Sequence, residues 1–206
     1  MTPSRRDDRV ELACGSPLGF LALHAGVEEG TGQLARAAAA LVSATLLTIR
    51  QSSSDFSHHR PSHMYEAPAY PELTTFWSTA RLAVSLHGHN GTEESIYVGG
   101  RNRDQARRLH RVLERRLPGW TVVSDLDAIP TGLRGLHPRN PVNLCELGGV
   151  QLELPTRLLG WRPDRAGGLE FRAELVDPEL PHALAEYSDA VTPSLTAAGA
   201  HSRSGR

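Results

Sequence analysis

The sequence predicts a single α/β domain with a mixed, mostly parallel sheet flanked by helices. Apolar runs of strand length alternate along the chain with stretches of helical periodicity, which is the pattern of this fold class. A strand–helix–strand unit near the start indicates that at least one pair of strands is parallel. The length of 206 residues suits one domain with a well-buried core.

The first half of the chain supplies that strand–helix–strand unit. Residues 19–23 form an apolar run of strand length, an alanine-rich helix follows over about 33–44, and residues 46–49 form a second strand. Residues 51–71 are rich in Ser, His and Pro and predict a long loop, a kind of segment that is often functional.

The second half continues the alternation. Residues 103–117 predict an amphipathic helix, because five apolar side chains recur on one face at helical spacing. The other predicted elements are a helix at 72–80, strands at 82–86, 96–98, 121–123 and 149–154, a loop at 132–143 and a last helix at 178–191.

The polar face of the 103–117 helix is dense with arginine. These side chains are either a nucleic-acid patch or a solvated helix face. The net charge is −1 and no aromatic residues interleave with the arginines, so we favour the solvated face and expect no nucleic-acid partner. The chain has no run of about 18 apolar residues, so we expect no membrane span. We also expect the protein to be a monomer.

Composition excludes several other classes of chemistry. All 22 basic residues are arginine, which excludes a lysine Schiff base or a phosphate-binding P-loop lysine. Cys14 and Cys145 are too few for a disulfide framework or a cysteine-rich zinc site. The polar N-terminus lacks a signal-peptide pattern, so we expect a protein that is cytoplasmic or released. We divide the chain into a lead-in (1–17), a main domain (18–195) and a disordered tail (196–206).

Two predicted strands lead into histidines followed by glycine-bearing turns. His24 follows residues 19–23, and Glu28 and Glu29 come next; His87 follows residues 82–86. Imidazole nitrogens and a carboxylate at one sheet edge are the ligand set of a catalytic zinc. The alternative for each is a solvent-facing side chain at a strand end. In the strand 149–154, Val150, Leu152 and Leu154 face one way, which leaves Glu153 on the other face, costly to bury unless it has a partner or a role.

These pieces in this order resemble the phage-related poly-γ-glutamate hydrolase family, a group of zinc metallocarboxypeptidase-like hydrolases. The matching segments run from about residue 19 to residue 157. They are Leu-His-Ala-Gly-Val-Glu-Glu-Gly-Thr at 23–31, His-Arg-Pro-Ser-His-Met-Tyr-Glu at 59–66, Ser-Leu-His-Gly at 85–88, Tyr-Val-Gly-Gly at 97–100 and Gly-Gly-Val-Gln-Leu-Glu-Leu at 148–154.

The resemblance implies a metallocarboxypeptidase-like fold and a Zn²⁺ ion held by His24, Glu28 and His87. It favours Glu28 over Glu29 as the carboxylate ligand and implies that Glu153 is the catalytic acid/base. Members of such families often carry an Asn-Arg pair near residue 143 to grip a substrate carboxylate, but Leu144 stands where that arginine would be. Our candidate substrate contacts are therefore Asn143, Arg139, Arg157 and His63, with the surface-loop alternative open for His63.

The function that the resemblance implies is zinc-dependent hydrolysis of glutamyl amide bonds, with anionic poly-γ-glutamate as the substrate. Two alternatives stay open at this point. The same site would also suit a small N-acyl amino acid or a peptide, and a non-catalytic binding protein of the same fold would keep the metal without turnover.

Overall fold

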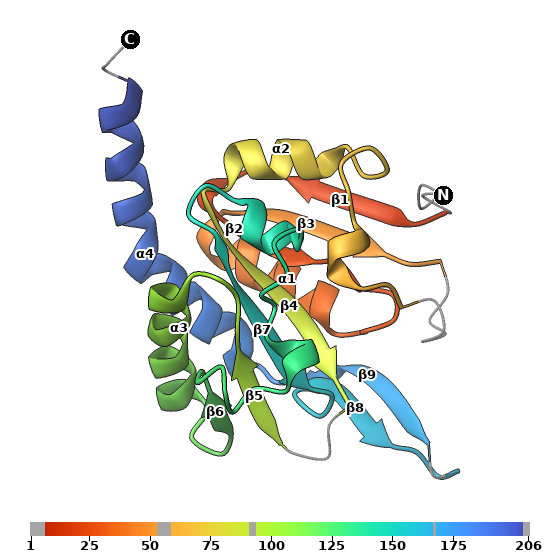
Figure 1. The fold of residues 1–206 in the computed structure, drawn as a ribbon. Helices are drawn as coiled ribbons and strands as arrows, with labels where there is room; N and C mark the ends of the chain where they lie inside the picture. Colours follow the sequence, from red (N-terminus) through yellow and green to blue (C-terminus); the bar gives the residue numbers. More distant parts are fainter. Residues whose placement is uncertain (1–6, 53–58, 91–93, 167, 204–206) are drawn as a thin grey trace.

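The computed structural model describes residues 7–52, 59–90, 94–166 and 168–203, and its centre is a seven-stranded sheet (Figure 1). The strand order is β1-β3-β2-β4-β7-β5-β6, in which β1–β3 and β5–β7 are antiparallel and the other four pairs are parallel. The predicted mixed, mostly parallel sheet is therefore confirmed. The strands of this sheet are β1 (Arg9–Ala13), β2 (Ser16–Ala22), β3 (Ala44–Arg50), β4 (Leu82–His89), β5 (Ser95–Val98), β6 (Thr121–Val123) and β7 (Gly149–Pro155).

Helices cover both faces of the sheet (Figure 1). The larger core cluster joins one face to α1, α3 and α4, whereas the smaller cluster joins the other face to α2. Strand β2 shows why both faces need cover: Phe20 and Ala22 belong to the first cluster and Leu21 to the second. The helices are α1 (Thr31–Val42), α2 (Glu72–Thr79), α3 (Arg103–Arg116) and α4 (Glu179–Arg203), with short 3₁₀ turns η2 (Ser62–Met64), η3 (Thr131–Leu133) and η4 (Pro141–Leu144).

The turn between β2 and α1 is fixed by Gly30. This residue has φ of 99°, a conformation that L side chains rarely adopt, and a β-carbon there would lie 2.4 Å from the carbonyl oxygen of Leu159. Its N–H donates to the Gln33 side chain at 3.2 Å, in place of a side-chain cap. The turn therefore packs tightly against the chain that follows β7.

Strand β4 is longer than we predicted. It continues through residues 87 to 89, pairing in parallel with β7, so His87 and His89 belong to the strand and do not follow it. Hydrogen bonds to the neighbouring strand β7 extend β4 past Gly88, although the sequence pattern indicated that the strand ends before this glycine.

A two-stranded hairpin, β8 (Leu159–Pro163) with β9 (Leu169–Val176), was not predicted. The sequence of β9 does alternate: apolar Phe171, Ala173 and Leu175 take turns with charged Glu170, Arg172 and Glu174. The high charge of β9, which is largely exposed, hides that signal. The hairpin is tied to the turn after β2, because the Trp161 Nε1–H donates to the backbone oxygen of Glu29 at 3.0 Å.

Helix α4 extends to Arg203, where we predicted a disordered tail from residue 196. The alanines at 197, 198 and 200 favour helix, which accounts for the extension. The arginines of α3 partly serve to join the helices, since Arg116 Nε donates to Glu186 of α4 at 2.7 Å. Across the ranges that the structure describes, no helix is both long and apolar enough to cross a membrane.

Candidate metal centre and active site

Two metal-ligand candidates come from one tight turn after β2. The N–H of Glu28 donates to the carbonyl oxygen of His24 at 2.7 Å, and this helical turn brings the two side chains to the same side. Gln51 fixes the backbone of this turn. Its Nε2 donates to the Leu23 carbonyl oxygen at 2.7 Å, and its Oε1 accepts from the Gly26 N–H at 3.0 Å. Local sequence and one buried glutamine thus fix the pair.

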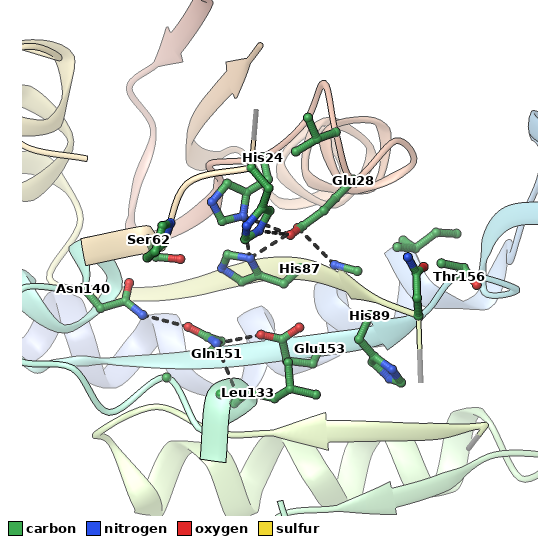
Figure 2. Close-up of a pocket in the computed structure, with 18 of the residues that line it drawn as sticks. His24, Glu28, Ser62, His87, His89, Leu133, Asn140, Gln151, Glu153 and Thr156 are labelled. Carbon is green, nitrogen blue, oxygen red and sulfur yellow. Dashed lines mark hydrogen bonds and ion pairs between the residues drawn. The ribbon is translucent and has the colours of Figure 1, made fainter. Parts of the chain in front are cut away.

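His87 reaches the same point from the neighbouring strand β4 (Figure 2). Its Nδ1 lies 3.1 Å from His24 Nδ1 and 3.3 Å from Glu28 Oε2, while His24 Nδ1 lies 3.1 Å from Glu28 Oε1. All three side chains are buried. The structure therefore brings together the three residues that the sequence suggested as ligands.

The spacing of these atoms suits a metal ion. Two ligand atoms at 2.0–2.1 Å from a tetrahedral zinc are about 3.3 Å apart, close to the separations found here. The Nε2 atoms of His24 and His87 are buried without a hydrogen-bond partner in the part of the chain that the structure describes, so the polar contacts of both rings converge through Nδ1. Two imidazoles and one carboxylate are also the donor set of catalytic zinc sites.

His59 is a further candidate that sequence reasoning missed. Its Nε2 lies 3.0 Å from Glu28 Oε1, and its ring centroid lies 4.4 Å from that of His24. His24, Glu28 and His59 therefore also form a group with ligand spacing. We favour His87 as the second imidazole because it is buried on a strand, whereas the side chain of His59 is 28% exposed and stands on the loop. The histidine-rich segment 59–66 was the available signal.

Charges within the cluster stabilise an ionised carboxylate. Burial opposes ionisation of Glu28, yet the adjacent His24 and His87 hold its pKa well below its usual range. The N–H of Gly88 also donates to Glu28 Oε2 at 3.1 Å. Burial lowers the pKa of His24, while the carboxylates of Glu28 and Glu153 outweigh burial and raise the pKa of His87. The two imidazoles thus surround one ionised carboxylate, that of Glu28, and this arrangement suits a bound cation.

Glu153 lies beside this cluster because of strand register. In the parallel pair β4–β7 it stands opposite His87, and its side chain is buried. Gln151 donates to Glu153 Oε1 at 2.7 Å, and Asn140 donates to Gln151 at 2.7 Å. Burial raises the pKa of Glu153 to about 8, with a further upward contribution from Glu28. A carboxyl group of this kind can take up and release a proton near neutral pH.

A pocket of about 680 Å³ opens over the cluster and Glu153. Figure 2 shows Ser62 and Asn140 toward one end and Thr156 toward the other, with His87 between them. The hairpin contributes apolar lining through Trp161 and Leu169, and the predicted contact His63 also lines the pocket. This volume is in the range of small-molecule binding sites, and a few polar groups converge on it, as they do in such sites.

The other predicted substrate contacts lie elsewhere. Asn143 is buried, and its amide ties loops together: it donates to the carbonyl oxygens of Gly135 and His137 and accepts from the Arg101 N–H. Of the predicted cations, Arg139 forms an ion pair with Glu66 at 3.1 Å.

Arg157 is also engaged away from the pocket, in an ion pair with Glu94 and above the ring of Trp120. In the described part of the chain, neither arginine lines the pocket. Both are more than 60% exposed, because long charged side chains at loop positions turn to solvent and to local acids.

Comparisons with known proteins assign a family to this chain. The profile of the family described as "Poly-gamma-glutamate hydrolase" matches residues 6–160. The chain is 28% identical over 169 residues to the protein YndL of Bacillus subtilis, a match that covers 81% of this chain and 63% of YndL. The chain thus spans less than two thirds of the length of this curated relative.

Solved structures show the same fold. The structure of a bacteriophage poly-gamma-glutamate hydrolase has a TM-score of 0.70 at 23% identity, covering 89% of this chain and 88% of that one. The zinc-free structure of YndL has a TM-score of 0.69 at 22% identity, covering 89% and 90%. A metallo-carboxypeptidase from Burkholderia cenocepacia has a TM-score of 0.52 at 10% identity, covering 86% and 57%. The predicted metallocarboxypeptidase-like architecture is therefore confirmed.

Proposed function

The chain belongs to the poly-gamma-glutamate hydrolase family, and on that premise we propose that it is a zinc-dependent hydrolase of glutamyl amide bonds that acts on poly-γ-glutamate. Membership supports a hydrolase. The metal and the substrate are our proposals. The observation that carries them is the convergence of His24, Glu28 and His87 on one point, with Glu153 opposite His87 in the next strand.

His24, Glu28 and His87 would hold the ion, and His59 lies against the same carboxylate from the loop. A zinc ion held there would supply Lewis-acid chemistry, making water acidic enough to ionise at about pH 7 and polarising the amide carbonyl. The remaining chemistry belongs to the chain itself.

Glu153 is suited to the acid/base role. As a base it takes the proton of the attacking water, and as an acid it returns that proton to the leaving amide nitrogen. The hydrogen bond from Gln151 orients its carboxyl group. A pKa of about 8 favours the protonated form at neutral pH, and the charge of a bound cation would shift the balance toward the carboxylate.

The test combines metal analysis with a substrate screen. We expect about one zinc per molecule and cleavage inside long poly-γ-glutamate chains, measured as a rapid fall in viscosity, with much slower action on α-linked polyglutamate. A zinc-loaded protein that cleaves only a neutral N-acyl amino acid would favour the small-substrate alternative. Bound zinc with no hydrolysis of either class would favour the binding-protein alternative.

A further inference from the structure

The basic side chains that line the pocket are histidines, and an anionic substrate would meet these rather than lysine or arginine. The chain has no lysine, and no arginine is among the described residues that line the pocket. Apart from His24, His59 and His87, which contact Glu28, the basic lining residues are His63, His89 and His137. The Nε2 atom of His89 is already within hydrogen-bond distance of the Ser95 carbonyl oxygen, at 2.8 Å. This leaves His63 and His137 as the basic side chains to consider for anion binding.

These two side chains form a stacked pair in the lining of the pocket. His63 belongs to η2 and His137 to the loop before η4, and their ring centroids lie 4.1 Å apart at an interplanar angle of 22°. The backbone N–H of Arg139 donates to His137 Nδ1 at 3.1 Å. Because Nδ1 accepts that bond, the ring proton of neutral His137 sits on Nε2, which makes Nε2 a donor.

Neighbouring groups disfavour the charged form of His137. Desolvation, His63 and Arg139 all lower the pKa of His137. The Arg139 guanidinium is partly balanced by Glu66, at 3.1 Å. Two stacked imidazoles resist being protonated together, and an anion beside them removes that repulsion. The pair is therefore suited to a carboxylate that arrives from solution.

We propose that His63 and His137 form a carboxylate subsite that holds an α-carboxylate of a γ-linked glutamyl chain beside the metal centre. This inference rests on the proposed function and names the feature of the substrate that the site recognises. In a γ-linked chain each free carboxylate is bonded to the carbon that carries the amide nitrogen. In an α-linked chain it stands at the end of a two-carbon side chain. A subsite at a fixed position therefore distinguishes the two linkages.

Binding at this subsite takes up a proton. The carboxylate favours the charged form of the imidazole pair, so affinity weakens as pH rises and the pair loses its proton. The charged or titratable groups that face the pair are Glu66 and Arg139, with His59 four residues before His63 on the same loop.

Calorimetry with the zinc-loaded Glu153→Gln protein tests the proposal without turnover. The probe is γ-linked pentaglutamate, titrated in two buffers of different ionisation enthalpy to count the protons taken up. We expect His63→Asn and His137→Asn each to weaken binding roughly tenfold and to reduce proton uptake, with unchanged zinc content. His182→Asn, an exposed histidine on α4, is the matched control and should bind as the parent does.

Steady-state kinetics give a second readout in the active protein. The same substitutions should raise KM on the γ-linked polymer far more than they lower kcat, and should raise KM on the α-linked polymer much less. Both side chains are at least partly exposed, so melting temperatures should match the parent; His63→Gln and His137→Gln serve as second variants if they do not.

Dissociation constants within twofold of the parent for both variants would overturn the subsite and leave the proposed function standing. Zinc-loaded wild type that neither binds nor cleaves the γ-linked chain would overturn the proposed function and the subsite together, before any substitution is made.

Discussion

The side-chain amide of Gln151 donates a hydrogen bond to the carboxyl group of Glu153, with 2.7 Å between Nε2 and Oε1. The two residues stand two apart on β7, and the period of a strand places both on one face. Asn140 donates to Gln151 Oε1 from the preceding segment, also at 2.7 Å. The acid/base candidate is thus oriented by a short relay of amides that the sequence alone did not indicate.

Removing the relay should impair turnover without releasing metal. Gln151→Leu keeps similar bulk but cannot donate, so we expect kcat to fall roughly 10–100-fold, as for other groups that orient a catalytic side chain. Asn140→Ala should lower kcat less, and should add nothing in the Gln151→Leu background because it acts through Gln151. Additive effects of the two substitutions in this double-mutant cycle would show that Asn140 acts by another route.

Glu153→Gln separates proton transfer from metal binding. The substitution keeps the shape of the side chain but removes the base, so we expect zinc content to stay and kcat to fall about 10²- to 10⁴-fold. Glu146→Gln is the matched control, because that carboxylate is exposed and pairs with Arg81 on the surface. A Glu153→Gln protein with a near-normal rate would mean that Glu153 is a structural strand residue.

The metal ligands can be ranked by zinc content. His24→Ala and His87→Ala each remove a buried Nδ1 from the cluster and should abolish stoichiometric zinc binding. Glu29→Ala should keep zinc, since that side chain pairs with Arg50. His59→Ala should also keep it if His87 is the second imidazole. Zinc that survives in His87→Ala and is lost in His59→Ala would reverse this assignment.

The raised pKa of Glu153 predicts a pH-dependent stability of the metal-free protein. The folded carboxyl titrates at about 8 and the unfolded one at about 4.3, so between these values the folded state binds the extra proton. The free energy of unfolding should therefore fall as pH rises through this window, by an amount on the order of a few kcal/mol.

Urea unfolding of wild type and Glu153→Gln across pH 4 to 8 measures this contribution, because the variant lacks the titrating group. The difference between the two proteins should grow with pH in the absence of metal. Added zinc should reduce it, since a nearby cation favours the ionised carboxylate. A difference that stays constant across this range would show that Glu153 does not titrate there.

The sequence by itself determined the class of fold and the local half of the site. Periodicity identified six of the seven sheet strands and the four helices because burial on one or two faces leaves a repeat of about two or 3.6 residues. The His24–Glu28 spacing was also readable, since one short turn brings these two side chains together. The hairpin β8–β9 was not predicted because its exposed strand, β9, is rich in charged residues.

Tertiary structure decided everything that depends on register and on the direction of side chains. Glu153 faces His87 only because β4 and β7 pair in one register, and a shift by one residue would turn it to the opposite face. Arg139 and Arg157 lie near the site in sequence but pair with Glu66 and Glu94, outside the pocket. His63 meets His137 through two loops distant in the chain. Such contacts depend on long-range packing, which leaves no periodic trace in a single sequence.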